Sequence, residues 1–406
     1  MQDTTYTPRM EGLDALRGFA LFGLFIVHMP ELFELYWAHP ATDPFQLAVH
    51  DAVWLVFAGK AFALLALCFG VSFFIIMDRA ARRGVDFTGR FVWRLVLLAA
   101  MGLLHGLWYR GDVLEVLAVM GLFLLPFHRV RSNRVLLAVA VLFLLQPLML
   151  VRIVAGLAGA DWANQPLRFW SATIPQVYLD GGFVDTLRMN VAEGWAFKWL
   201  FMYESGRLSQ ILGLSLVGML LGRIGFFSRP QEFARARVTG LLIALGVAVA
   251  LYFAREPLAA WVPASEAMPM PRALTGALLG SLFDLAVMAV LMLGFVALYH
   301  GGAHRALGVL APAGRMTLTL YIAQSLLFVP VFYGYGLGLH ASMTQVQALL
   351  LGLAAFAVQV LFAHLWFRRF YYGPLEWVWR AGTYLTVDVP FVKRGNGAPG
   401  KERVPA

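Results

Sequence analysis

The sequence predicts an all-α bundle of about ten membrane-spanning helices, with both chain ends in the cytoplasm. Of its 406 residues, 60% are hydrophobic and 14% are charged, and the mean hydropathy is +0.71. Soluble domains carry roughly 25% charged residues, so this composition excludes an ordinary soluble protein. Two further observations support the prediction: apolar runs of spanning length, and cations concentrated in one set of alternate connections, the other set being poor in them.

The apolar runs recur along almost the whole chain. A spanning helix needs about 20 predominantly apolar residues. The third and fourth runs are short and are joined by Arg110, Gly111 and Asp112, which indicates a helical hairpin. The expected spans are 13–36, 52–77, 91–109, 112–127, 134–156, 207–225, 237–254, 273–298, 307–329 and 346–367.

Charge asymmetry between the connections predicts the orientation. The connections 38–51 and 330–345 contain no Lys or Arg. Cytoplasmic loops carry the excess of Lys and Arg in membrane proteins, so the cationic set faces the cytoplasm and the number of spans is even. The cationic set contains Arg79, Arg82, Arg83, Arg90, Arg129, Arg131, Arg134, Arg229, Arg235, Arg237 and Arg305.

Two segments differ from simple loops. Residues 157–206 form a long outer connection rich in tryptophan; a structureless loop of that length is uncommon, so interfacial helices are expected there. Residues 1–387 are expected to form one bundle domain. Residues 388–406, with Gly, Pro and charges, are expected to be a disordered cytoplasmic tail.

Several function classes are disfavoured. The net charge of +9 is explained by cytoplasmic loop cations, and no basic cluster alternates with stacking aromatics, so no nucleic-acid partner is expected. Cys68 is the single cysteine, which rules out an intrachain disulfide. The histidines lack ligand spacing with carboxylates, so no metal and no tightly bound cofactor are expected.

The first span carries ionisable residues that can act together from one helix. Asp14 and Arg17 are three residues apart and can pair. His28 follows Arg17 by eleven residues, about 16 Å along the same face. Arg17 can therefore bind phosphates of a cytosolic donor, with His28 deeper as base or nucleophile. The spacing fits equally well a histidine that only packs against a neighbouring helix.

His105 and Asp112 form a second candidate pair, in the hairpin. They lie toward the outer face, where His105 is a second base candidate. Asp112 can orient that histidine, or it can equally cap the following helix.

A third cluster follows Gly314. Arg315 lies near the cytoplasmic end, at the depth of Arg17, and is a second candidate for donor phosphates. Beyond it, polar residues recur at helical spacing and are expected to line a substrate path or to join helices by hydrogen bonds: Thr317, Tyr321, Gln324 and Ser325.

Three more polar residues are expected to line a substrate path or pore. Asp284 is buried within the eighth span and needs a partner. Arg207 opens the sixth span from outside, with Gln210 beside it. Lys60 is expected to extend toward the outer interface.

These motifs resemble the YeiB-like membrane family (domain of unknown function 418), in the order in which that family has them. The resemblance rests on Leu13–Gly23, on the hairpin Gly102–Leu114, on the block from Gly314 to Ser325, and on the motif from Gly373 to Arg380. The family is similar to the transmembrane acyltransferases, whose type 3 members have an Arg, ten intervening residues and the active His in the first helix. Arg17 and His28 have that spacing.

The resemblance implies a multi-pass protein of the bacterial cytoplasmic (inner) membrane. We expect an acyltransferase that moves an acyl group, acetyl by preference, from cytosolic acyl-CoA to a hydroxyl or amine at the outer face. The acceptor is a small molecule, a glycan or a lipid; membrane lipid surrounds the chain, and homo-oligomer formation is left open. The alternative is a transporter or exporter of a small or lipid-like solute, whose path the same buried charges line.

Overall fold

The computed structural model describes residues 10–169, 174–266 and 268–393, and within these ranges the chain is helical. The β-type pairing of the described residues is limited to two isolated bridges, Ser265 with Met268 and Phe370 with Val392. The predicted all-α class is therefore confirmed.

Six helical segments are long and apolar enough to cross a membrane. A seventh candidate is the pair α6 (Asn133–Leu144) and α7 (Pro147–Leu157), which is bent by 47°. The six are α2–α3 (Pro44–Phe57 and Lys60–Arg82), α4 (Thr88–Trp108), α12 (Arg207–Ile224), α13 (Ala234–Ala260), α14 with its extension (Met270–Leu298, then η3 Tyr299–Ala303 and α15 His304–Gly308), and α18 (Gln345–Arg369).

The other three expected spans are helices that fall short of this test. Helix α5 (Leu114–His128) has 15 residues and α17 (Thr317–Phe332) has 16. Helix α1 (Glu11–His28) has 18 residues but contains three charged side chains near its start, Glu11, Asp14 and Arg17. Each expected run thus contains a helix, although the run 13–36 leaves α1 after His28 and the run 52–77 is broken between Phe57 and Lys60. The count of ten spans and their orientation remain predictions.

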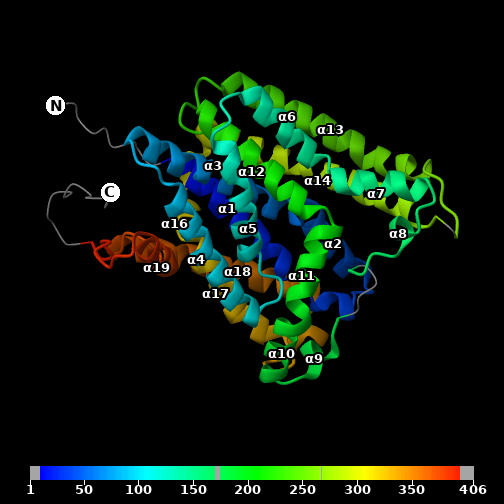
Figure 1. The fold of residues 1–406 in the computed structure, drawn as a ribbon. Helices are drawn as coiled ribbons and strands as arrows, with labels where there is room; N and C mark the ends of the chain where they lie inside the picture. Colours follow the sequence, from blue (N-terminus) through cyan, green and yellow to red (C-terminus); the bar gives the residue numbers. More distant parts are fainter. Residues whose placement is uncertain (1–9, 170–173, 267, 394–406) are drawn as a thin grey trace, which may run out of the picture.

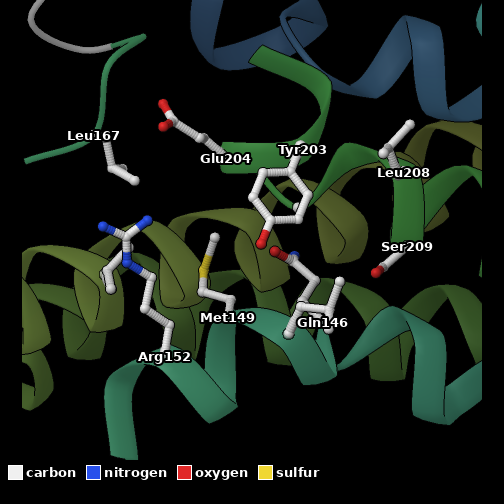
Figure 2. Close-up of a pocket in the computed structure, with 11 residues that line it drawn as sticks. Gln146, Met149, Arg152, Leu167, Tyr203, Glu204, Leu208 and Ser209 are labelled. Carbon is white, nitrogen blue, oxygen red and sulfur yellow. The ribbon is translucent and has the colours of Figure 1, made fainter. Parts of the chain in front are cut away.

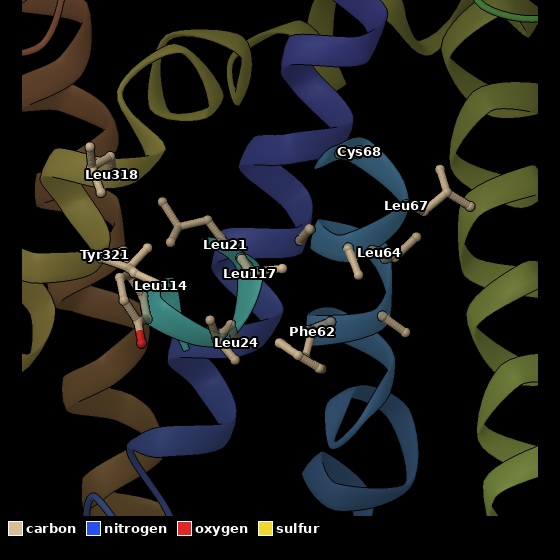
Figure 3. Close-up of a cluster of buried hydrophobic side chains, with 14 of the residues drawn as sticks. Leu21, Leu24, Phe62, Leu64, Leu67, Cys68, Leu114, Leu117, Leu318 and Tyr321 are labelled. Carbon is tan, nitrogen blue, oxygen red and sulfur yellow. The ribbon is translucent and has the colours of Figure 1, made fainter. Parts of the chain in front are cut away.

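Helix α1 packs at the centre of the bundle. Figure 3 shows Leu21 and Leu24 of α1 between the apolar side chains of α3 on one side and those of α5 and α17 on the other. Against α16 (Ala311–Arg315) the backbones touch, because a Cβ on Gly18 would collide with the carbonyl of Leu310, and one on Gly314 with the carbonyl of Asp14. Small residues permit this approach.

The connection 158–206 contains several short helices. They are α8 (Asp161–Asn164), α9 (Gln176–Asp180), α10 (Phe183–Met189), η2 (Asn190–Gly194) and α11 (Trp195–Glu204). Buried Glu115 of α5 fixes this segment, because its carboxylate accepts hydrogen bonds from Trp195 and Trp199 (2.8 Å each) and from Lys198 (2.7 Å). A helical outer segment was expected; its position relative to a membrane stays a prediction.

The short helix α19 (Pro374–Tyr384) covers the opposite end of the bundle from α9 and α10 (Figure 1). Glu376 accepts hydrogen bonds from the backbone N–H groups of Leu318 and Thr319 and thereby caps α17. Residues 388–393 of the expected tail run beside Phe370–Tyr371, where the N–H of Tyr371 donates to Phe391 O at 2.9 Å. The rest of that tail, 394–406, lies outside the described residues.

Candidate functional site

Helix α1 ends at His28 in a turn with unusual backbone geometry. Leu32, Phe33 and Glu34 all have positive φ, at 52°, 50° and 80°, although none of them is glycine. Such a conformation costs roughly 1–2 kcal/mol per residue and persists only where surrounding contacts hold it. One such contact is the hydroxyl of buried Tyr333, which donates to Phe33 O at 3.2 Å. The turn, followed by η1 (Leu35–Ala38), brings two glutamates back toward His28.

His28 lies among acidic and phenolic groups. Its Nδ1 is 3.6 Å from Glu31 Oε2 and 3.4 Å from the hydroxyl of Tyr109. The same hydroxyl is 3.4 Å from Glu34, whose carboxylate forms a 2.5 Å ion pair with Arg110. Both glutamates and His28 retain some exposure, so this region combines a possible base with polar contacts open to a ligand.

A buried relay of three side chains joins the ends of α4 and α5 to α17. His105 Nδ1 is 2.7 Å from Asp112 Oδ1, and His105 Nε2 is hydrogen-bonded to Ser325 Oγ. All three side chains are buried. The second oxygen of Asp112 accepts from the N–H groups of Leu114 and Glu115, so the carboxylate both orients the histidine and caps α5. Serine, histidine and aspartate in this order form the constellation of nucleophilic acyl transfer.

Tyr109 lies between the two histidines. Its ring centroid is 5.8 Å from that of His28 and 6.4 Å from that of His105. Tyr321 closes the other side of His105 at 5.3 Å, and its hydroxyl accepts from the N–H of Val113. The structure thus brings together His28, His105, Asp112, Tyr321 and Ser325 from the sequence-predicted set.

An apolar cavity of about 410 Å³ opens beside the relay. It follows the seam between α4 and α17, from Leu375 of α19 at one end to Phe183 of α10 at the other, and His105 lines it. An apolar molecule in this seam would lie beside His105, whose side chain is itself 1% exposed.

The two arginines expected to bind a donor lie on different sides of α1. Arg17 pairs with Asp14 at 3.1 Å and is hydrogen-bonded to Ser72 of α3. Arg315 instead lies 3.8 Å from the ring of Phe367 of α18 and donates to Tyr371 O. Arg17 is thus held against α3, whereas Arg315 packs against α18.

The remaining predicted path residues form separate groups. Gln324 donates to Gln359 of α18 at 2.9 Å. Lys60 is buried rather than extended to an interface: its Nζ is 2.6 Å from Asp284 Oδ1, so each supplies the partner that the other needs. Gln210 donates to Ser281, as does Gln146.

Some site residues escaped the sequence reasoning. Tyr109 and Arg110 belong to the hairpin motif, but no sequence pattern marks either of them as a site residue. Glu34 joins the site only because the turn at Leu32–Glu34, where φ is positive, brings it there. Gln146, at the α6–α7 bend, has a φ of 54°; the adjacent Pro147 was the available sign of that break. Figure 2 shows Gln146 on the wall of a small pocket with Arg152, Tyr203 and Ser209. Among the described residues, no group of three His, Cys, Asp or Glu side chains is arranged to hold a metal ion.

Six apolar helical segments around enclosed polar clusters define a multi-pass helical membrane protein. The family model "Protein of unknown function (DUF418)" matches residues 221–386. The chain is 26% identical to the uncharacterized protein YxaH of Bacillus subtilis (strain 168), over 95% of this chain and 97% of that protein. It is 28% identical to the uncharacterized protein YeiB of Escherichia coli (strain K12), over 91% and 94%. The chain is thus similar to YxaH and YeiB over most of its length, and to the DUF418 family model over residues 221–386.

Proposed function

We propose that this protein is a membrane acyltransferase that uses acyl-CoA as co-substrate and transfers the acyl group to a hydroxyl or amine. The proposal rests on one observation: the side chains of Asp112, His105 and Ser325 are linked by hydrogen bonds beside an apolar cavity. A histidine with a buried carboxylate on one nitrogen and a hydroxyl on the other is oriented to remove the hydroxyl proton.

The relay supports a two-step transfer. Ser325 Oγ attacks the thioester carbonyl, His105 Nε2 takes the hydroxyl proton, and the C–S bond breaks as the thiolate leaves with that proton. In the second step His105 deprotonates the acceptor, whose oxygen or nitrogen attacks the acyl-serine and restores Ser325. Ser325 Oγ also lies 3.0 Å from Ile322 O. The hydroxyl proton of Ser325 therefore has two acceptors within reach, His105 Nε2 and Ile322 O. When the acyl group leaves Ser325, the imidazole returns a proton to its oxygen.

The donor and acceptor enter this scheme from opposite ends. Arg315, the last residue of α16, precedes Ser325 of α17 by ten residues across the break at Met316. Arg17 lies eleven residues before His28, about 16 Å along α1. When a phosphate of CoA is bound to either arginine, the thioester end of the molecule extends along the α4–α17 seam to the relay. His28, with Glu31 and Tyr109, serves the acceptor at the other end, either as its base or as its binding contact.

The test measures acyl-CoA turnover by purified protein in lipid nanodiscs, with acetyl-CoA and a long-chain acyl-CoA as donors. Release of free CoA that stops in His105→Asn supports the proposal, and His28→Ala then tells whether the second histidine takes part. The rival function, solute transport, predicts counterflow of substrate with no CoA release. Unchanged CoA release in His105→Asn would overturn the role of the relay.

A further inference from the structure

A second polar cluster, separate from the relay, surrounds the ion pair of Lys60 and Asp284. Three helix breaks meet near it: Gly59 between α2 and α3, Gln146 between α6 and α7, and Gly206 before α12, with φ of 77°, 54° and 71°. Broken helices inside membrane bundles expose backbone and side-chain polar groups, and they often form binding sites.

Cations outnumber carboxylates in this cluster. Lys60 is paired with Asp284, and two arginines act on Lys60 as well, Arg207 and Arg255. Lys60 and Arg255 both lie over the ring of Phe283, at 5.6 and 5.2 Å. Asp284 and Arg207 both lie against Gly59, where a Cβ would sit 2.9 Å from Asp284 Oδ2 and 3.6 Å from a guanidinium nitrogen of Arg207.

Arg207 has hydrogen-bonding capacity to spare. Its guanidinium lies near the rings of Phe62 and Phe201, at 5.7 and 5.1 Å, and among the described residues no acceptor lies within hydrogen-bond or ion-pair distance of it. The other acid that acts on Arg207, Glu31, is occupied by His28 and by the indole of Trp37. A half-buried guanidinium with free N–H donors can bind two oxygens of a carboxylate or phosphate in a bidentate manner.

Two other features point to the same place. Arg207 is the first residue of α12, whose initial N–H groups and positive dipole end favour anions. Gln146 is fully buried, its Oε1 has no partner among the described residues, and that atom lies against Gly206 at the same helix start. Because this oxygen only accepts hydrogen bonds, its partner must be a donor: a water, or a hydroxyl group that the ligand carries.

We infer that Arg207, Lys60 and Arg255 form a binding site for an oxyanion, a carboxylate or a phosphate. Arg207 contacts the oxyanion and the other two cations add charge, while Asp284 keeps Lys60 in place. Asp284 is about one-third exposed, so the cluster is reachable from outside the protein. The site does not depend on acyl transfer, and its oxyanion comes from a lipid headgroup or from a soluble compound.

The experiment compares wild type with Arg207→Gln and Arg207→Lys, and uses Arg188→Gln as a control because that arginine is 78% exposed on α10. One arm measures by native mass spectrometry how much phosphatidylglycerol the purified protein retains relative to phosphatidylcholine. The other follows thermal unfolding while inorganic phosphate or acetate is added at constant ionic strength. Neither readout requires acyl-CoA turnover.

We expect binding in one arm to weaken at least about tenfold in Arg207→Gln, equivalent to about 1.4 kcal/mol, less in Arg207→Lys, and not at all in Arg188→Gln. If Arg207→Gln loses retention of phosphatidylglycerol, the ligand is a lipid headgroup. If it loses thermal stabilisation by phosphate or acetate, the ligand is a soluble oxyanion. If Arg207→Gln does not fold, Arg207→Lys and Arg255→Gln must both weaken binding. Wild-type protein that shows neither form of binding, or folded variants that bind as wild type does, would overturn the inference.

Discussion

The imidazole of His105 and the carboxylate of Asp112 lie 2.7 Å apart across the turn that joins α4 to α5. The turn is short, because α4 ends at Trp108 and α5 begins at Leu114, and Gly102 leaves room for the approach: a Cβ there would meet the backbone of Glu115 and the Asp112 carboxylate. The pair is therefore built into the hairpin, and Ser325 reaches it from α17.

The first prediction concerns this pair. Asp112→Asn keeps the shape but removes the negative charge that holds the proton on His105 Nδ1, so the ring no longer presents a free Nε2 to Ser325. We expect CoA release to fall at least about a hundredfold. Asp51→Asn is the control, because Asp51 is exposed and contacts His50 outside the relay; equal rates in the two variants would contradict the assigned role.

The second prediction concerns the ion pair between Arg110 and Glu34, the last residue of the turn with positive φ. Glu34→Ala leaves the Arg110 guanidinium buried without its carboxylate, which costs about 3–5 kcal/mol. A large drop in the detergent melting temperature is expected. Arg229→Ala removes a largely exposed ion pair with Glu232 and is expected to change the melting temperature little. A small effect of Glu34→Ala would mean that Arg110 finds water or another acceptor.

The third prediction concerns the contact of α1 with α16. Gly18→Ala places a methyl group against the carbonyl of Leu310, so the helices must separate, and such overpacking costs about 1–3 kcal/mol. Gly280→Ala in α14 is the matched control, since no atom lies within 4 Å of its added Cβ. It gains helix propensity of up to about 1 kcal/mol. Similar melting temperatures for the two variants would refute the close packing.

The fourth prediction concerns pH. Burial raises the pKa of Glu376 above its ordinary value of 4.5, and hydrogen bonds from Thr319 and Leu318 offset part of that rise. The folded state therefore binds the proton more tightly than the unfolded state does. The contribution of Glu376 to stability is greatest below pH 4.5 and declines as pH rises through the raised pKa.

The check is the melting temperature of wild type and Glu376→Gln at pH values on either side of 4.5. The neutral amide removes the titration, so the difference between wild type and variant must shift in favour of the variant as pH rises. A difference that does not depend on pH would show that Glu376 has the same pKa in both states.

The sequence predicted local features well and distant pairings poorly. Hydropathy located every long helix, because spanning length is a property of consecutive residues. The pairing of His105 with Asp112 is also a local feature, since the two residues are seven positions apart. Ser325 was assigned only to a polar stripe, since its contact with His105 joins residues 220 positions apart.

Other site features depend on packing that no local pattern records. The turn at Leu32–Glu34 contains no glycine or asparagine, so its sequence does not predict the positive φ values. A hydrogen bond from Tyr333, three hundred residues later in the chain, helps to hold the turn. The sequence showed that Asp284 needs a partner, but it placed Lys60 at an interface. The break at Gly59 turns that lysine inward, where it pairs with Asp284.

A search for the acyl-enzyme tests whether Ser325 is the nucleophile. Purified protein in nanodiscs is incubated with radiolabelled acyl-CoA in the absence of acceptor, quenched in acid, digested and mapped by mass spectrometry. We predict label on Ser325 that disappears in Ser325→Ala and in His105→Asn. CoA turnover without any labelled serine, or with the label on His28, would contradict it.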